Sequence, residues 1–449
     1  MASTYLNKTF STTGDRQKFT LSMWVKRGIV PVGNQSGTER MLFNAYQDSS
    51  NQDQIWLQSN GTINYVRNNA NAVTPSQVLR DPAAWYHVVF AGDTTQGSNA
   101  DRLKVYINGT QAPIGQQDTI TQGSNFGAIN NAQLSTFGRR NGSNDWYFDG
   151  SMANIEMVDG QQYGPEYFGS TDTATGIWKP GGSSAISNYG TNGYKLKMDT
   201  TSPGADTSGK NNTFTPSGTP TLLQGSPSNV YATLNPILGS NLIGSTVTFS
   251  NGNTTGEDPN GSASGVNPYF SSTIGMPSKG KFYCELKPSS FSTSSGHGIG
   301  IFRTSSGNPN DITSSSNQIR FIFADTSIYI SKYGSSVQSG LTAISAGQVV
   351  GMALDLDNGT LQYYVNGSTR GSQVTGVNSA NDGYIYFFFA NLESSSSGRY
   401  GKYEWNFGEG FFGTTAAGTQ SDDNGQGLFA YDPPAGYYAL NTKNLEAYG

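Results

Sequence analysis

Acid–base chemistry in this chain would depend on its carboxylates and on two histidines, His87 and His297. Hydrolysis of a glycosidic bond needs two carboxyl groups that flank the bond, for example in the spacing Glu-x-Asp-x-x-Glu along one strand. No glutamate in the sequence begins this spacing. The nearest pair, Glu156 and Asp159, would point to opposite faces of an extended strand. We therefore expect a protein that is not an enzyme, and we keep a glycoside hydrolase as an alternative.

Neither histidine is placed for nucleophilic catalysis. His87 lies inside the strand-like run "WYHVVF", and His297 begins another strand in "SSGHGIG". The single cysteine, Cys284 in "KFYCELK", has no histidine near it in sequence, so the sequence shows no catalytic Cys-His pair. We predict framework roles for both histidines and a buried position for Cys284. Contact between His297 and a ligand is the alternative for that residue.

Glycan binding is the chemistry for which the sequence offers the densest set of residues. A sugar has an apolar face that packs on aromatic rings and a hydroxylated edge that needs short polar or charged groups. The segment "GRRNGSNDWYFDG", 138–150, gathers both kinds of side chain on a turn, where binding residues are often displayed. The candidate carbohydrate-binding residues are Arg139, Arg140, Asn144, Asp145, Trp146 and Tyr147. The alternative is that Trp146 only covers a sandwich edge, and "ESSSSGRYGKYEW", 393–405, is a second candidate loop.

The elements that position these residues are predicted to be strands. Charged residues make up 13% of the chain and aromatic residues 12%, and there are 57 glycines. This composition suits short, aromatic-rich strands joined by tight turns. Runs such as "FTLSMWVK", 19–26, alternate with the period of a half-buried strand, and no segment keeps a long helical period. The sequence therefore predicts an all-β protein.

A short motif occurs once in each half of the chain. It reads "LKVYINGT" at 103–110 and "LQYYVNGS" at 361–368, an alternating strand that ends in Asn-Gly. Asn-Gly favours the primed turns that match the twist of a hairpin. Because 449 residues exceed the usual size of one core, we predict two antiparallel β-sandwich (jelly-roll) domains in tandem. Their bounds are 1–222 and 236–449, with a linker at 223–235.

Charge and hydropathy exclude several classes of partner. A net charge of −5 and a pI near 5.1 argue against binding to nucleic acid, which calls for a basic face. No apolar run approaches the roughly 18 residues of a membrane-spanning helix, so no membrane insertion is expected. The start "MASTYLNKTFSTTG" has neither a basic nor an apolar region of a signal peptide. A single cysteine also excludes an internal disulfide framework.

The first half of the chain resembles a known family. "FTLSMWVKRG", "WYHVVFAGD", "LKVYINGT" and "FGRRNGSNDWYFDGSMANIEMVDGQQY" follow one another as in laminin-G-like domains of the concanavalin-A-like lectin/glucanase superfamily. The resemblance covers residues 1 to about 170 and implies a β-sandwich. Because such domains sometimes hold calcium at a sandwich rim, Asp145 and Asp149 are candidate calcium ligands. No other cofactor is expected.

The second half, from about 236 to 449, is similar to SPRY domains. "GKFYCELK", "GIGIF", "GQVVGMALDLDNGTLQYYVNGS", "YEWNFGEGFF" and "PPAGYYALNTKNL" follow the order of that family. A laminin-G-like sandwich followed by a SPRY-like sandwich resembles a class of virion proteins of tailed bacteriophages. The resemblance implies a non-catalytic structural protein of the virion surface, of the capsid decoration or head/tail fibre type, docked on the capsid or the tail.

The same resemblance implies the partners and the location. The partners would be other virion proteins of the capsid or tail, further copies of the chain in a homo-oligomer with a trimer as candidate, and a host-surface glycan. The protein would be made in the host cytoplasm and would reside on the virion surface. The first alternative is a tail-fibre receptor-binding protein, that is, a carbohydrate-binding adhesin, and the second is a concanavalin-like glycoside hydrolase.

Overall fold

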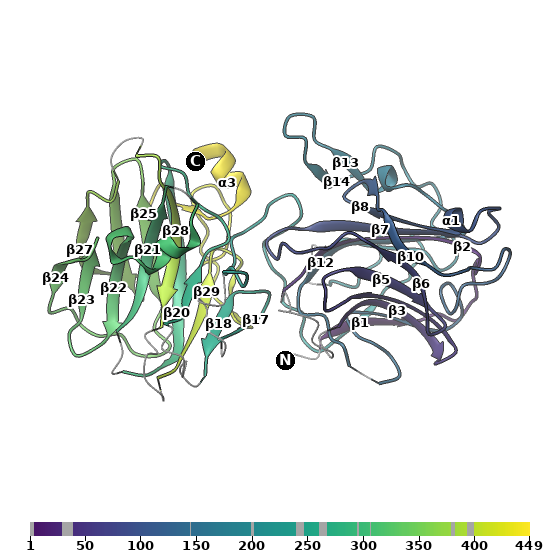
Figure 1. Cartoon of the computed structure of the whole chain (residues 1–449), viewed down its shortest axis with the longest axis horizontal. Coiled ribbons are helices and arrows are strands. Elements are labelled where there is room, and N and C mark those ends of the chain that lie inside the picture. The colour runs from purple at the N-terminus through teal and green to yellow at the C-terminus, as the bar shows by residue number, and fades with distance from the viewer. Residues whose placement is uncertain are drawn as a thin grey trace. The chain divides into compact units, whose positions relative to one another are not determined.

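The chain divides into two compact units, residues 1–222 (unit 1) and 223–449 (unit 2). The computed structural model describes residues 4–28, 39–143, 145–198, 202–238, 247–259, 267–293, 296–305, 307–378, 382–392 and 399–449. Within these residues both units consist of strands, with a few short helices (Figure 1). Almost all strand pairs are antiparallel, and β20 with β32 is a parallel pair. The prediction of an all-β antiparallel protein is confirmed.

Unit 1 contains two main sheets in its described residues, and their apolar faces enclose one core. The larger sheet has the strand order β10-β6-β5-β4-β3-β11-β1-β16. Its strands are β1 (Tyr5–Thr9), β3 (Arg40–Asp48), β4 (Asn51–Leu57), β5 (Ile63–Arg67), β6 (Ala70–Pro75), β10 (Ile114–Gln117), β11 (Leu134–Phe137) and β16 (Thr215–Ser217).

The second sheet of unit 1 has the order β15-β12-β2-β7-β8-β9. Its strands are β2 (Lys18–Lys26), β7 (Tyr86–Asp93), β8 (Leu103–Ile107), β9 (Thr110–Gln111), β12 (Ser151–Asp159) and β15 (Tyr194–Leu196). Smaller elements are α1 (Asn99–Arg102), the 3₁₀ turn η1 (Pro165–Tyr167) and the hairpin β13 (Gly169–Thr171) with β14 (Trp178–Pro180). Phe19 of β2 stacks on Tyr65 of β5 with ring centroids 6.2 Å apart, so the two sheets share their core.

Unit 2 repeats the two-sheet plan with different strand orders. One sheet runs β17-β18-β29-β20-β25-β26-β27 with β32 added on β20, and the other runs β19-β28-β21-β22-β23-β24. The first consists of β17 (Thr248–Ser250), β18 (Thr255–Asp258), β20 (Lys281–Phe291), β25 (Val350–Asp355), β26 (Thr360–Val365), β27 (Ser368–Thr375), β29 (Gly401–Asn406) and β32 (Tyr438–Ala439).

Unit 2 also contains a second sheet and several small elements. The sheet consists of β19 (Tyr269–Ser271), β21 (His297–Thr304), β22 (Gln318–Ala324), β23 (Tyr329–Lys332), β24 (Ser335–Ser339) and β28 (Ile385–Asn391). The remaining elements are β30 (Phe411–Phe412), β31 (Thr415–Ala416), η2 (Pro309–Thr313), η3 (Ser315–Asn317) and α3 (Thr442–Tyr448).

The repeated hairpin motif has the same geometry in both units. In β8 the residues Leu103, Val105 and Ile107 are buried between half-buried Lys104 and Tyr106, and β26 shows the same alternation. Both residues of the turn after β8 have positive φ, 48° at Asn108 and 80° at Gly109, as a type I′ turn requires. The Asn-Gly turn after β26 has 49° and 76°. The alternation and the turn predicted for this motif are therefore correct.

The segment 223–235, for which we expected a linker, packs into unit 2. Tyr231, Ala232 and Leu234 are buried in clusters of that unit. The backbone N–H of Ala232 donates to the carbonyl of Leu440 at 3.0 Å, which holds the segment beside the C-terminal residues. The Ser-Pro-rich composition that suggests a linker does not exclude such packing, because the apolar residues follow it immediately.

Candidate functional site

The candidate glycan loop, 138–150, lies over the outer face of the larger sheet of unit 1. It connects β11 to β12, and hydrogen bonds of Gly138, Asn141 and Trp146 attach it to β3. The backbone N–H of Met41 donates to the carbonyl of Trp146 at 2.9 Å, and the backbone N–H of Asn141 donates to Oδ1 of Asn44 at 2.8 Å. The loop therefore places Trp146 on the face of the sheet opposite the core, while its Phe148 packs against the core.

A first stack joins Trp56, Trp146 and Arg140. The rings of Trp56 and Trp146 are stacked with centroids 4.3 Å apart, and the guanidinium carbon of Arg140 lies 3.8 Å from the Trp146 ring centroid. Nε and Nη2 of Arg140 donate to the two carboxylate oxygens of Asp145, each at 2.7 Å. Partial burial disfavours the Asp145 charge, but hydrogen bonds from Arg140 and Ser143 lower its pKa overall. Asp145 thus holds Arg140 flat against the indole.

A second cluster joins Tyr147, Tyr5 and Arg139, with the rings of Tyr5 and Tyr147 tilted by 52° to each other. The guanidinium carbon of Arg139 lies 3.8 Å from the ring centroid of Tyr5, and the rings of Tyr5 and Tyr147 are 6.4 Å apart. Nη2 of Arg139 also donates to Oδ1 of Asn141 at 3.0 Å. Tyr5 and Trp56 each follow or precede a core residue of the larger sheet, Leu6 and Ile55, so both clusters lie on its outer face. A guanidinium group over an aromatic face is attracted by the ring quadrupole.

The site consists of six residues that we call the aromatic–arginine platform: Tyr5, Trp56, Arg139, Arg140, Trp146 and Tyr147. All six are partly exposed. The structure brings together five of the residues that the sequence singles out, while Asn144 lies outside the described residues. Trp146 lies on the face of the sheet, where it covers Trp56.

Two members of the platform, Tyr5 and Trp56, are not singled out by the sequence. They come from strands β1 and β4, far from the loop in the chain. The alternation of β4 contains a usable signal, because Ile55 and Leu57 face the core and Trp56 must then face outward. The register that places β4 beside β3, and hence under the loop, has no such local signal.

The two candidate calcium ligands do not form a calcium site. Asp145 is engaged by Arg140, and Oδ2 of Asp149 lies 3.4 Å from Nε of Arg40. Burial raises the pKa of Asp149, although Arg40 opposes this effect. Within the described ranges no group of three or more His, Cys, Asp or Glu side chains is gathered for a metal. Calcium needs six to eight oxygen ligands, so the described residues do not fit this ion.

The second candidate loop, 393–405, is only partly described, because residues 393–398 lie outside the described residues. Tyr400 is exposed. Tyr403 and Trp405 belong to β29 and are fully buried in the core of unit 2. Two of the three aromatic residues of this loop are therefore inaccessible to a ligand.

The carboxylates considered for catalysis are engaged in structural contacts. Glu156 accepts a hydrogen bond from the Tyr189 hydroxyl at 2.5 Å and forms an ion pair with Lys195 at 2.9 Å. Asp159 accepts backbone N–H groups from Asp15 at 2.8 Å and from Asn192 at 2.9 Å. Both side chains contact the segment 189–195, and the alternation of β12 directs them to opposite faces of the strand.

Both histidines are fully buried and hydrogen-bonded, as predicted for framework residues. Nε1 of Trp178 donates to Nδ1 of His87 at 2.9 Å, and Nε2 of His87 lies 2.8 Å from the Ser22 hydroxyl. The Trp178 donor requires Nδ1 to be an acceptor, so the ring is neutral with its proton on Nε2. Burial lowers the pKa of His87 to about 3 and that of His297 to about 4.

Unit 1 should lose stability on acidification because of His87. Its pKa is lower in the folded chain than the 6.5 of the unfolded chain, so its contribution is complete above pH 6.5 and is lost as the pH falls. Between pH 7.5 and 4.5 we expect a loss of about 2 to 3 kcal/mol. Urea unfolding followed by tryptophan fluorescence measures it, since five of the six tryptophans lie in unit 1. His87→Gln should remove this part of the pH dependence, and an unchanged slope would contradict it.

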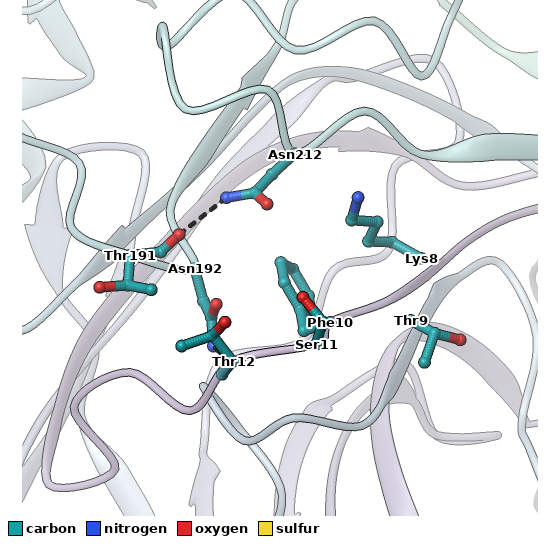
Figure 2. A pocket seen from close by; sticks show the side chains of 8 residues that line it. All are labelled: Lys8, Thr9, Phe10, Ser11, Thr12, Thr191, Asn192 and Asn212. Atoms are coloured by element: carbon teal, nitrogen blue, oxygen red, sulfur yellow. Dashed lines mark hydrogen bonds between the residues drawn. The ribbon is translucent and has the colours of Figure 1, made fainter.

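A small polar hollow lies at the end of β1, away from the platform residues. It is lined by Lys8, Thr9, Phe10, Ser11, Thr12, Thr191, Asn192 and Asn212 and has a volume of about 100 Å³. Figure 2 shows Lys8, Thr12 and Asn212 around the hollow. Nδ2 of Asn212 donates a hydrogen bond to the carbonyl of Thr191 at 3.0 Å. Small-molecule sites usually have roughly 300–1,000 Å³. This hollow is therefore too small for a sugar residue.

The comparison with protein families gives a match in unit 1. Residues 2–161 match the family model Laminin_G_3, described as concanavalin A-like lectin/glucanases superfamily. Unit 1 therefore has a concanavalin A-like lectin fold, as the sequence motifs indicate. No curated protein sequence matches the chain significantly. Among the helices of the described residues, none is long and apolar enough to cross a membrane.

Several solved structures are similar to parts of the chain. The SPRY domain of human HERC1 is 16% identical, with 35% of this chain and 91% of that chain covered and a TM-score of 0.28. A putative carbohydrate binding protein from Bacteroides ovatus is 14% identical, with coverages of 48% and 58% and a TM-score of 0.32. A SAP-like pentraxin from Limulus polyphemus is 16% identical, with coverages of 36% and 72% and a TM-score of 0.27. TM-scores this low do not identify a function.

Proposed function

We propose that this chain is a non-catalytic carbohydrate-binding protein and that the aromatic–arginine platform is its binding surface. The observation that carries the proposal is the pair of cation–π contacts on the outer face of the larger sheet, Arg139 on Tyr5 and Arg140 on Trp146, each at 3.8 Å. Aromatic rings that are partly exposed offer a sugar its apolar contact. The guanidinium and amide groups beside them can bind the hydroxyls. The concanavalin A-like lectin fold of unit 1 agrees with a binding role.

The burial and the hydrogen bonds of the ionisable groups support the proposal that the chain is not a catalyst. Glu156 and Asp159 are used to hold neighbouring segments, and His87 is buried and neutral. A general acid needs access to the leaving oxygen of the substrate. None of these groups reaches an open surface in the arrangement described. The glycoside hydrolase stays as the second alternative, and release of reducing sugar would favour it.

We also propose a setting for this binding role, namely the surface of a tailed-bacteriophage virion. The support is the resemblance of the tandem to such proteins, seen in motifs such as "LKVYINGT" and "LQYYVNGS". The chain would dock on the capsid or the tail as a homo-oligomer, with a trimer as candidate, and would contact host glycans. A tail-fibre receptor-binding adhesin is the first alternative. Immunogold labelling of this protein on phage particles tests the setting. It shows whether the protein lies on the capsid shell, lies at the tail tip or is absent from the virion.

Binding by the whole chain to an immobilised oligosaccharide array tests the carbohydrate proposal. We expect wild-type binding and a loss of about 10-fold or more for Trp146→Ala, which removes the centre of the first stack. Tyr163→Ala is the matched control, because Tyr163 is a partly exposed aromatic residue stacked on Tyr167 at 4.1 Å in the cluster that includes Val89 of β7 and Val158 of β12. Equal losses for both variants, or no binding by the wild type, would refute the proposal.

A further inference from the structure

Two side chains on the outer face of the larger sheet of unit 1 stand directly opposite each other. The backbone register pairs Trp56 of β4 with Asn64 of β5. The neighbours of Asn64, Ile63 and Tyr65, both belong to the core. Because side chains alternate along a strand, Asn64 points to the outer face, as Trp56 does. Directly opposite side chains are about 5 Å apart at Cβ, so the indole and the amide are adjacent.

These two side chains have buried polar atoms with no partner. Asn64 is 0% exposed, and among the described residues neither its Nδ2 nor its Oδ1 has a hydrogen-bond partner. Nε1 of Trp56 is likewise buried without an acceptor. Two donor groups and one acceptor are therefore unpaired at one place. Buried polar groups are normally paired, and an exception calls for an explanation such as a ligand.

Trp146 covers this place in a strained conformation. Its ring is stacked on Trp56 at 4.3 Å, while its backbone has φ of +53°. The left-handed region is unfavourable for a bulky residue, and such strain tends to be found at functional sites. Trp146 is attached to β3 through its carbonyl, which accepts from Met41 at 2.9 Å. Its ring can therefore change position while the backbone attachment is kept.

We propose that a single uncharged sugar residue inserts between the indoles of Trp56 and Trp146 and presents its hydroxyl edge to Asn64. The inference rests on the proposed carbohydrate-binding function and names the ligand class of that site. A ring lying flat on Trp56 directs its hydroxyls sideways, toward the neighbouring strand. Vicinal hydroxyls can donate to Oδ1 and accept from Nδ2 of one amide. Trp146 then packs on the second face of the sugar.

The charges near this subsite favour an uncharged ligand. Arg140 is matched by Asp145 through two hydrogen bonds of 2.7 Å, and Arg40 by Asp149 at 3.4 Å. The floor itself consists of an indole and an amide. An anionic sugar inserted here would bury its charge on a floor that carries no positive charge, which is unfavourable. A neutral hexose has no such penalty.

The decisive variant is Asn64→Leu, which keeps a similar volume and removes both unpaired polar atoms. Calorimetric titrations with maltohexaose, laminarihexaose, cellohexaose and mannohexaose supply neutral probes, and hexagalacturonate is the acidic probe. We expect at least one neutral hexaose to bind the wild type and to bind Asn64→Leu about 10-fold more weakly or worse. Far-UV circular dichroism should show an exciton couplet of the stacked indoles that disappears when this hexaose binds.

The other outcomes separate the inference from the proposed function. Equal binding of a neutral hexaose by wild type and Asn64→Leu, or binding of hexagalacturonate alone, would overturn the inference and leave carbohydrate binding intact. No binding of any hexaose by the wild type would overturn both. The exciton signal of unliganded Asn64→Leu shows that the variant is folded. If it is missing, Asn64→Ser takes its place with the same expected results.

Discussion

Asp53→Ala is expected to destabilise unit 1 by about 3–5 kcal/mol, the range found when one partner of a buried charged network is removed. Asp53 is 0% exposed in β4. Its carboxylate accepts backbone N–H groups from Gly127 at 3.1 Å and from Ala128 and Ile129 at 2.7 Å each. The Tyr65 hydroxyl donates to it as well, at 2.6 Å. Alanine leaves all four donors buried without an acceptor.

The loss should extend to the core, because the loop that Asp53 holds is part of it. Ala128 and Ile129 are buried in the main cluster of unit 1. Urea unfolding followed by tryptophan fluorescence measures the effect. Asp48→Ala is the control, since Asp48 is an acidic residue of the neighbouring strand that only caps the turn between β3 and β4 through Ser50 and Asn51. A change for Asp53→Ala as small as that of the control would contradict the prediction.

The strands could be predicted because their signal is local. In "FTLSMWVK" the alternation alone places β2 within one residue of its observed bounds, Lys18–Lys26. The turns of the repeated motif were equally predictable, because Asn-Gly adopts positive φ more readily than other pairs. Both features depend on residues that are neighbours in the chain.

The role of Asp53 was only half visible in the sequence. Asp53, Ile55 and Leu57 alternate along β4 and therefore share one face of the strand. Because Ile55 and Leu57 face the core, the alternation directs the Asp53 carboxylate toward the core as well. Its partners at 127–129 belong to an irregular segment with no periodic pattern. They meet Asp53 only after β3, β4 and β11 have formed the sheet.

The candidate site was predictable to the extent that it is a continuous segment. Arg139, Arg140, Trp146 and Tyr147 could be grouped because they lie within one turn region. Trp56 could not be added, since its contact with Trp146 requires β4 to pair with β3 in the observed register. The arginines that contact Asp145 and Asp149 could not be predicted for a related reason, as the spacing of two acids does not show which cations will face them.

At pH 5, Glu285→Gln is expected to destabilise unit 2 by about 2–4 kcal/mol, although the two side chains have the same shape. Glu285 lies in β20 and is fully buried. Its oxygens accept the backbone N–H groups of Ala430 and Tyr431, each at 2.9 Å, and the amide of Asn406 at 3.2 Å. Glutamine supplies one acceptor, and its NH₂ group would face a backbone N–H. The single cysteine, Cys284, is buried in this unit, so its labelling rate in urea reports the unfolding.

The pH dependence of the same variant tests whether Glu285 is structural. Burial raises its pKa to about 7, against 4.5 in the unfolded chain, so its contribution is complete below pH 4.5 and is lost as the pH rises through 7. From pH 5 to pH 8 the wild type should lose about 2 to 3 kcal/mol that Glu285→Gln does not lose. His297 has the opposite effect: burial lowers its pKa to about 4, so unit 2 loses stability at acid pH. This effect is the same in wild type and variant, and it cancels when the free energy of unfolding of the variant is subtracted from that of the wild type.

A carboxyl group with a pKa near 7 is also what a glycoside hydrolase uses as its general acid. In Glu285 the cause is burial, and the oxygens are occupied by the backbone that they hold in place. The two interpretations therefore make opposite predictions for Glu285→Gln. A structural carboxylate gives a less stable unit 2 with unchanged glycan binding. A catalytic acid gives normal stability and the loss of a sugar-releasing activity, and that result would assign Glu285 to catalysis.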